Sequence, residues 1–202
     1  MISVIMPSYL GAYKKAAADR DKKIVRAINS VAKQTYKDWE LIIIADGCDK
    51  TVDIVQGIND LYSKFQLRVL YIDKQPTWSG TVRNTGLDAA KGDYCCYLDI
   101  DDAFAPDHLE GLAPFTKKDW YWFDDYIWNG TEFRHRRGNI NKPGQCGTSS
   151  IMHKRDIARW EIVGGYAHDW IFIKNLKRAS TSYEYIKAGR YLVCHVPGRF
   201  DI

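Results

Sequence analysis

The sequence predicts an α/β fold in which helices cover both faces of a mostly parallel sheet. Short apolar runs alternate with helix-like segments between residues 2 and 102, an order typical of βαβ units. One of these runs, 94–98, ends abruptly in the carboxylates Asp99, Asp101 and Asp102. Because ligands of open α/β sheets bind at the carboxyl ends of the strands, this run also predicts where a functional site lies.

The first half of the chain divides into strands and helices at its turn residues. Four short apolar runs are expected to be strands: 2–6, 41–45, 67–72 and 94–98. Pro7 stops the first of them, and Asp46-Gly47 stops the second. Helices are expected at 24–31, where apolar residues recur at helical spacing, and at 81–90.

The pattern changes in the second half, after Pro106. Helices are expected at 108–112, 153–160 and 169–177, and a last strand is expected at 190–196. An aromatic-rich segment, 120–128, alternates like a strand and is expected to pair with 132–137 across the turn dipeptide Asn129-Gly130. Three tryptophans share one face of this segment and either stack on a sugar ring or pack in the core: Trp120, Trp122 and Trp128.

The composition excludes several classes of protein. The chain has 202 residues, of which 46% are hydrophobic, so a disordered chain is excluded. Its net charge of +4 suits an anionic substrate or an acidic membrane surface but lacks the clustered basicity of a nucleic-acid binder. The five cysteines form no Cys-x-x-Cys pair, which argues against a disulfide framework or a zinc site. With no signal peptide and no membrane-spanning run, we expect a cytoplasmic protein, peripheral to a membrane at most.

The three carboxylates after the run 94–98 predict a site for a hard divalent cation. Carboxylate oxygens suit Mg²⁺ or Mn²⁺, either of which can carry the phosphates of a substrate. The alternative is that Asp101 and Asp102 only cap the following helix, because Asp favours helix starts. One Asp is enough for a cap, so the presence of three favours the cation.

Several short sequence blocks are each weak evidence of a family relationship, but their order and spacing together are strong evidence. These blocks are 3–9, 27–31 with 34–36, 40–48, 83–86, 90–94 and 98–102. Together they resemble the family 2 glycosyltransferases of GT-A fold, over residues 2 to about 200. The resemblance implies a single GT-A domain, 1–202, with a nucleotide-sugar-binding half at 1–102 and an acceptor-binding half at 103–202.

The resemblance implies a donor site at the ends of the first two strands. Pro7, Ser8 and Tyr9 would wall the nucleobase, and Tyr9 could stack on it; the alternative for Tyr9 is a core aromatic. Asp46 would accept a hydrogen bond from a base N–H, and its alternative is a turn aspartate. Ala45 stands where the family usually has a first Asp, so Asp46 alone is left to meet the base.

The resemblance also assigns the groups that would face the sugar diphosphate. Arg83 would hold a diphosphate oxygen or brace Asp99. Asp99 would contact the ribose, and Asp101 would ligate the metal. His195 resembles the histidine that completes metal or diphosphate binding in some members, although a structural histidine is the alternative.

For the reaction, the resemblance implies transfer of a hexosyl-type sugar to an acceptor hydroxyl with inversion. Asp169, which stands where the family places its base, would accept the hydroxyl proton; a helix N-cap is its alternative. His168 precedes it where the family usually has Glu. Asp124 and Asp125 form a rival acidic pair, interpreted as acceptor-site or structural residues.

The donor expected by default is a UDP-sugar, with GDP- and dTDP-sugars open, and the acceptor is expected to be a carbohydrate or a glycan-bearing molecule. The oligomeric state is left open. One competing function is a non-catalytic donor-binding or carbohydrate-binding domain, against which the retained carboxylates argue. Another is a sugar-nucleotide pyrophosphorylase, which would need a Gly-rich basic loop where this chain has residues 7–11. A dinucleotide oxidoreductase would need a Gly-x-Gly-x-x-Gly motif there.

Overall fold

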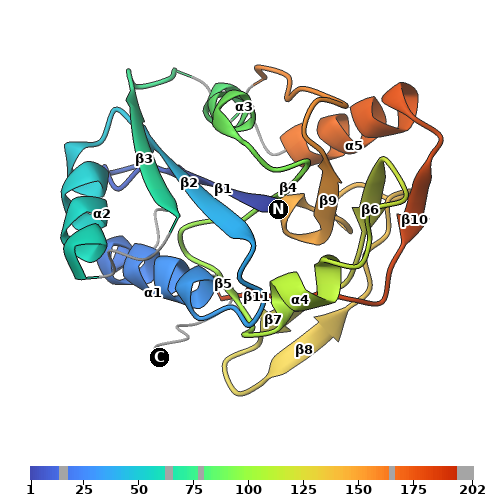
Figure 1. Cartoon of the computed structure of the whole chain (residues 1–202), viewed down its shortest axis with the longest axis horizontal. Helices are drawn as coiled ribbons and strands as arrows, with labels where there is room; N and C mark the ends of the chain where they lie inside the picture. Colours follow the sequence, from blue (N-terminus) through green and yellow to red (C-terminus); the bar gives the residue numbers. More distant parts are fainter. Residues whose placement is uncertain (14–17, 62–65, 77–79, 164–166, 195–202) are drawn as a thin grey trace.

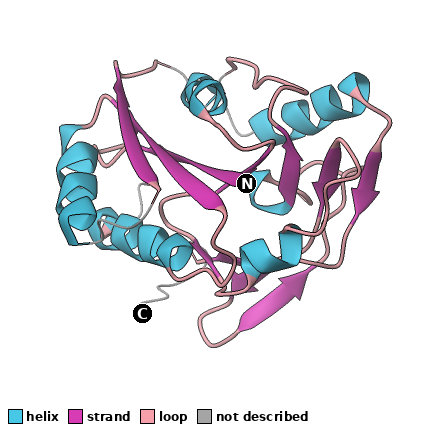
Figure 2. Ribbon diagram, viewed as in Figure 1, coloured by secondary structure: helices cyan, strands magenta, loops and turns pink. Residues whose placement is uncertain are grey.

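The computed structural model of the chain describes residues 1–13, 18–61, 66–76, 80–163 and 167–194. A larger sheet lies between helices, and a smaller sheet lies below it in the view of Figure 1; Figure 2 separates the helices and strands by colour. The larger sheet contains β1 (Ile2–Ser8), β2 (Trp39–Asp46), β3 (Leu67–Ile72), β4 (Tyr94–Tyr97), β6 (Trp120–Trp122), β9 (Ile151–Lys154) and β10 (Tyr183–Tyr185). The smaller sheet contains β5 (Ala103–Phe104), β7 (Asp125–Trp128), β8 (Phe133–Arg136) and β11 (Tyr191–Val193). The helices are α1 (Arg20–Ala32), α2 (Asp49–Leu61), α3 (Gly80–Ala89), α4 (His108–Leu112) and α5 (His168–Ala179).

The larger sheet is mostly parallel, which confirms the predicted fold class. Its strand order is β10-β6-β9-β4-β1-β2-β3. β1 pairs in parallel with β2 and β4, β2 pairs in parallel with β3, and β10 pairs in parallel with β6. β9 runs antiparallel to both of its neighbours, β4 and β6. The carboxyl ends of β1, β2, β3, β4 and β6 therefore meet at one edge of the sheet, which we call the carboxyl edge.

Both faces of this sheet are apolar and covered by helices. Successive residues of a strand point to opposite sides, so apolar residues of one strand enter both apolar clusters. In β1, Val4 and Met6 join a cluster that also includes apolar side chains of α1, α2 and α4. Ile5, between them, joins a second cluster with side chains of α3 and α5. Buried parallel strands of this kind read as continuous apolar runs, which is why β1, β2 and β4 are visible in the sequence.

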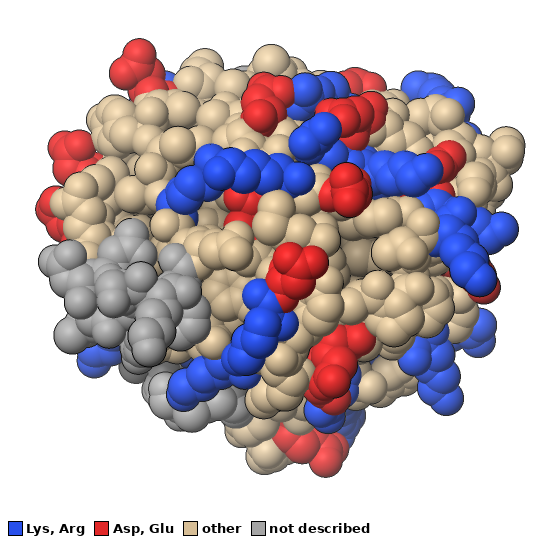
Figure 3. Space-filling view, in the orientation of Figure 1, with Lys and Arg blue, Asp and Glu red and all other residues tan. Residues whose placement is uncertain are grey.

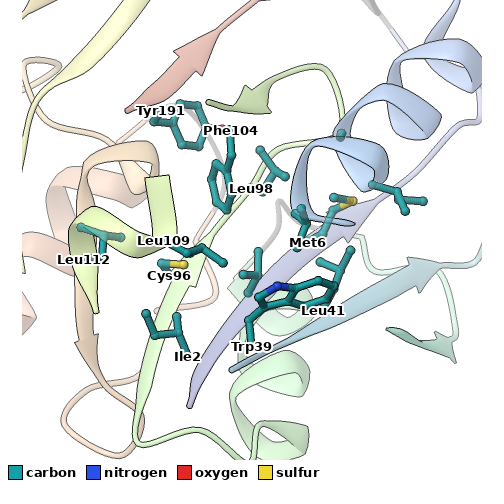
Figure 4. Close-up of a cluster of buried hydrophobic side chains, with 14 of the residues drawn as sticks. Ile2, Met6, Trp39, Leu41, Cys96, Leu98, Phe104, Leu109, Leu112 and Tyr191 are labelled. Atoms are coloured by element: carbon teal, nitrogen blue, oxygen red, sulfur yellow. The ribbon is translucent and has the colours of Figure 1, made fainter. Parts of the chain in front are cut away.

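The first cluster also joins the smaller sheet to the larger one. Figure 4 shows Phe104 and Tyr191, from β5 and β11, close to Leu98 at the end of β4. The rings of Phe104 and Tyr191 are 5.6 Å apart in an edge-on arrangement. Tyr191 is fully buried there, so the residues that follow β4 lie against the smaller sheet.

Three elements, α2, β5 and β10, are absent from the sequence prediction. The signal for α2 is present, because Val55 and Ile58 are spaced by one helical turn and both are buried. Asp49 adds a negative charge in the first turn, which favours a helix start. β10 has only three residues, and Tyr183 and Tyr185 gain their strand geometry from pairing with β6.

The predicted helix at 153–160 is wrong. Residues Ile151–Lys154 form β9, an antiparallel strand inserted between β4 and β6, so tertiary pairing overrides the helix-like pattern. The predicted single strand at 120–128 is two strands, β6 in the larger sheet and β7 in the smaller one. The hairpin across Asn129-Gly130 is present as the antiparallel pair β7–β8.

Charged side chains of both signs lie interspersed on the face drawn in Figure 3. This mixture agrees with the small net charge of +4. Within the described ranges, no helix has the length and hydropathy needed to cross a bilayer.

Glu40 holds the starts of several strands together at the edge opposite the carboxyl edge. Its side chain, in β2, accepts hydrogen bonds from Ser3 Oγ at 2.6 Å and from the Lys91 amide at 2.5 Å, and it pairs with Arg68 Nη2 at 2.6 Å. Burial alone would raise the pKa of the Glu40 carboxyl, but these hydrogen bonds outweigh it and hold the pKa below its usual value of 4.5. The ionised form is therefore the one that the fold stabilises.

We expect Glu40→Gln to lower the free energy of unfolding near neutral pH by about 1–3 kcal/mol, because charged hydrogen bonds to a buried group are lost. Since the folded pKa lies below the unfolded one, this contribution is present above the unfolded pKa and disappears as the pH falls through the folded pKa. Urea denaturation of both proteins at several pH values measures the effect. Glu132→Gln, at an exposed ion pair, serves as the control; equal losses in the two variants would contradict the assignment.

Candidate active site

Acidic residues follow three strands at the carboxyl edge. Asp46 ends β2, Asp99 comes two residues after β4, and Asp124 comes two residues after β6. These strands are parallel in the sheet, so their ends meet. Asp46 and Asp99 were expected at strand ends, whereas Asp124 was expected inside a strand. A cavity of about 670 Å³ lies at the opposite edge, lined by residues that include Met1 and Asp93. None of the acidic residues of the carboxyl edge lines that cavity.

The residues 99–102 form a tight turn that is held from two sides. The Asp102 amide donates to the Asp99 carbonyl at 3.1 Å, which closes the turn. Asp102 is 2% exposed, and its carboxylate accepts from Tyr191 Oη at 2.9 Å and from the Cys194 amide at 2.7 Å. Tyr191 Oη also accepts from the Asp99 amide at 3.1 Å. Asp102 therefore supports the turn through its carboxylate.

Helix α1 holds the same turn through its backbone. Arg26 Nη2 donates to the carbonyl oxygen of Asp101 at 2.6 Å. This contact fixes the main chain of Asp101 at the turn. The side chain of Asp99 is 38% exposed, so it is open to solvent or to a ligand.

Arg83, in α3, braces Asp99. Its Nη2 lies 3.2 Å from Asp99 Oδ1, and its side chain is only 4% exposed. Arg83 is thus a buried cation directed at the end of β4, where a negative diphosphate would be attracted. Two roles were expected for Arg83, to hold a diphosphate oxygen or to brace Asp99. The contact with Asp99 is present in the structure.

The predicted base-binding residues converge at the ends of β1 and β2, where Pro7 pairs in register with Ile44. Asp46 accepts from Lys74 Nζ and from the Gln75 amide, both at 2.7 Å. Lys74 Nζ also lies 4.4 Å from the ring centroid of Tyr9. Ser8 is buried, with its Oγ 2.8 Å from Thr51 Oγ1.

Lys74 belongs to this group and is missed by the sequence analysis. The signal was available, because Lys74 comes two residues after β3 and the carboxyl ends of parallel strands share an edge. Its ammonium contacts both Asp46 and Tyr9, the acceptor and the ring expected to meet a base.

Asp169 lies in the first turn of α5 but does not cap the helix. The N-cap is Ala167, so the predicted alternative role of Asp169 as the cap is not observed. Asp169 Oδ1 is buried and lies 3.0 Å from His168 Nε2, outside hydrogen-bond geometry; it accepts no hydrogen bond from the described residues. Its Oδ2 faces Gly147, where a Cβ would stand only 3.3 Å away. A carboxylate with unused acceptor capacity is what a proton acceptor needs.

The rival carboxylates Asp124 and Asp125 are both occupied by protein donors. Asp125 is paired with Arg136 through two guanidinium contacts and also accepts from Ser149 Oγ at 3.1 Å. Asp124 accepts from His135 Nε2 at 2.6 Å and from Tyr185 Oη at 2.8 Å. Burial alone would raise the pKa of Asp124, but these hydrogen bonds outweigh it and lower the pKa.

The three predicted tryptophans do not share one surface. Trp120 is fully buried and stacks on Tyr183 with ring centroids 4.5 Å apart, so it belongs to the core. Trp122 is half-buried on the same strand, whereas Trp128 lies on β7 of the smaller sheet. Of the two interpretations, packing in the core holds for Trp120.

The donor set at the 99–102 turn fits a hard divalent cation. Asp99 and Asp101 offer carboxylate oxygens, and Mg²⁺ or Mn²⁺ is commonly held by one or two carboxylates together with substrate phosphates. Within residues 1–13, 18–61, 66–76, 80–163 and 167–194, no three His, Cys, Asp or Glu side chains form a ready metal cage. The predicted ligand His195 lies outside the described residues.

The sheet order, the covering helices and the carboxyl-edge site define the class of protein, which is a glycosyltransferase-like chain of GT-A fold. S. aureus TarS residues 1–349 in complex with UDP-GlcNAc superimposes with a TM-score of 0.74 at 19% identity, covering 98% of this chain and 59% of that one. The mannosyltransferase PcManGT from Pyrobaculum calidifontis, in complex with GDP-Man and Mn²⁺, gives 0.69 at 13% identity, covering 98% and 57%. Residues 3–173 match the sequence profile described as Glycosyl transferase family 2. The chain belongs to that family.

Curated relatives are similar over part of their length. An uncharacterized glycosyltransferase of Haemophilus influenzae is 35% identical over 116 residues, which are 57% of this chain and 42% of that protein. The poly(ribitol-phosphate) beta-N-acetylglucosaminyltransferase TarP of Staphylococcus aureus is 28% identical over 167 residues, which are 80% of this chain and 44% of TarP. The chain thus spans less than half the length of these two relatives.

Proposed function

We propose that this chain transfers a sugar from a nucleoside-diphosphate sugar to an acceptor hydroxyl, with inversion and with the assistance of a divalent cation. The observation that carries the proposal is the Arg83–Asp99 pair at the carboxyl edge. It places a buried cation and an accessible carboxylate between Asp46 of β2 and Asp124 beyond β6, in a chain of family 2. We further propose that residues 1–102 bind the donor and residues 103–202 bind the acceptor, within one domain.

On the donor side, Asp46 and Tyr9 would receive the base. Asp46 can accept a hydrogen bond from a base N–H, and the ring of Tyr9 offers a flat surface for the base. Lys74 contacts both groups in this structure, so a bound base would displace Lys74 or share them with it. Because TarS is described with UDP-GlcNAc and PcManGT with GDP-Man, a UDP-sugar is the first donor to test and a GDP-sugar the second.

At the diphosphate, the Asp101 carboxylate would hold Mn²⁺ or Mg²⁺, which when bound would neutralise charge on the leaving group. Arg83 adds a fixed positive charge in a buried setting, where a charge acts more strongly than in water. Asp99 is left to orient the ribose, with Arg83 fixing one of its oxygens.

On the acceptor side, Asp169 would accept the proton of the attacking hydroxyl. Its Oδ1 is the feature that supports this role, because the rival carboxylates Asp124 and Asp125 already accept hydrogen bonds from protein donors. Direct attack by the acceptor, with one carboxylate as the base, inverts the anomeric carbon and requires no covalent enzyme intermediate.

The experiment for the proposal is a thermal-shift panel of UDP-, GDP- and dTDP-sugars, with and without Mn²⁺. A ligand that binds only the native state raises the melting temperature, and the rise should require both nucleotide and cation. A donor found in this way is then tested for transfer to carbohydrate acceptors. Absence of any nucleotide-dependent shift would overturn the proposal.

We expect Asp46→Ala to weaken nucleotide binding by about tenfold or more, the scale of 1–3 kcal/mol for a buried hydrogen bond left unmet. Isothermal calorimetry measures the affinity, and the chemical step should be affected less. Lys74→Met is the matched control, because it removes the same ion pair while keeping the Asp46 carboxylate. Equal losses in the two variants would show that Asp46 only holds the turn around Lys74.

A further inference from the structure

The ring of Trp160 lies next to the guanidinium of Arg83. The guanidinium carbon of Arg83 lies 4.7 Å from the centroid of the Trp160 ring. Trp160 is 2% exposed, so this cation–π contact is shielded from water. Such contacts are stronger when they are desolvated. Arg83 thus contacts both an aromatic ring and a carboxylate.

The backbone of Trp160 is fixed to the helix that carries Arg83. The Asn84 side chain accepts from the Trp160 amide and donates to the Trp160 carbonyl, both at 2.9 Å. A Cβ at Gly80 would stand 2.5 Å from the carbonyl oxygen of Glu161, so α3 and this segment approach too closely for any side chain there. Arg159 also donates to the Asn84 carbonyl at 3.3 Å.

The ring of Trp160 is fixed just as firmly. It stacks on Phe172 of α5 with centroids 3.9 Å apart and planes inclined by 10°. Its Nε1 donates to Tyr97 Oη at 2.8 Å, and that hydroxyl lies 2.7 Å from His153 Nε2. With His153 Nδ1 2.8 Å from the Lys154 carbonyl, the Nδ1–H tautomer lets Tyr97 donate and completes the chain.

We infer that Trp160 is a positioning residue, which holds the guanidinium of Arg83 against Asp99 and so sets the diphosphate site. The inference rests on the proposed function, since the diphosphate is the group that Arg83 would meet. Trp160 contacts both α3, through Asn84, and α5, through Phe172. It therefore also connects the donor side to the helix that carries Asp169. A flexible or aliphatic residue at 160 would leave the long Arg83 side chain several rotamers in which it misses Asp99.

The test combines affinity for UDP or GDP in the presence of Mn²⁺ with variants of both residues. Trp160→Leu should weaken binding by about tenfold, the scale of a shielded cation–π contact, whereas Trp160→Phe, which keeps an aromatic face, should stay within about threefold. If Trp160 acts through Arg83, Trp160→Leu should add no further loss to Arg83→Ala. Trp39→Leu, at a tryptophan 4% exposed in the other cluster, controls for general loss of stability.

A second readout does not depend on any nucleotide. In the wild-type protein, ring currents of Trp160 should shift the NMR signals of the Arg83 side chain upfield, and Trp160→Leu but not Trp39→Leu should abolish the shift. An Arg83 signal that is the same with and without the Trp160 ring would overturn the inference. If the wild type binds no nucleotide while the ring-current result holds, the proposed function fails and the positioning of Arg83 stands. Losses in Trp160→Leu and Arg83→Ala that simply add would show that Trp160 acts only on stability.

Discussion

Asp101→Asn should reduce sugar transfer by about 10²-fold or more, the scale at which loss of one preorganised charge-stabilising group acts. The substitution keeps the size of the side chain and removes the charge that would hold Mn²⁺ or Mg²⁺. The fold should survive, because the contact that α1 makes with Asp101 uses its backbone carbonyl. Transfer assays over a range of Mn²⁺ concentrations, with calorimetry of Mn²⁺ and nucleotide together, measure the effect.

The matched control is Asp93→Asn, at the exposed residue just before the start of β4. It removes one carboxylate from the other end of the same strand, so both variants change the net charge equally. Wild-type activity in an excess of chelator, or equal losses in the two variants, would end the case for a cation at Asp101.

Asp169→Asn should reduce transfer by about 10²–10⁴-fold, the usual contribution of a positioned base. The amide has nearly the same shape but cannot accept the proton of the acceptor hydroxyl. Donor affinity should barely change, so the loss should appear in kcat rather than in the KM for the donor. Because the side chain of Asp169 makes no capping hydrogen bond, the melting temperature should change only by the small charge–dipole contribution at a helix N-terminus and by the lost contact with His168.

Asp156→Asn, an exposed aspartate in the turn after β9, is the control for loss of a negative charge elsewhere. Near-normal transfer by Asp169→Asn would move the base to Asp124 or Asp125. That outcome would require one of these carboxylates to give up the donors it now accepts from, His135 and Tyr185 or Arg136.

Local sequence patterns predicted the first half of the fold well, because buried parallel strands are continuous apolar runs. β1, β2, β3 and β4 appear where predicted, and so do α1 and α3. Apart from α2, which was missed although its periodic signal is present, the predictions fail where pairing with another strand decides the structure. β9 looks helical by itself and becomes a strand because it fills the gap between β4 and β6.

For the site, the sequence shows which residues end the strands but not what surrounds them. The positions of Asp46 and Asp99 at one edge follow from strand direction alone. Asp124 was expected inside a strand and lies at the edge because its segment divides into β6 and β7. The structural role of Asp102 within the turn 99–102 could not be predicted in this way. It depends on hydrogen bonds from Tyr191 and Cys194, which are distant in the sequence. The ring that contacts Arg83 belongs to residue 160, at the end of a segment whose helix-like pattern gave a wrong prediction, so the pattern did not reveal it.

The hydrogen bonds that shape the 99–102 turn also determine at what stage of synthesis this turn can adopt its final structure. Tyr191 and Cys194 lie 89 and 92 positions after Asp102, so their contacts with it form only after nearly all of the described chain has been made. A nascent chain that stops before Tyr191 already contains every described strand of the larger sheet. It can begin to fold from its N-terminal side, as growing chains do, but its turn still lacks the donors that set it. Under the proposed function, affinity for the nucleotide should therefore rise once β11 pairs with β5 and β7.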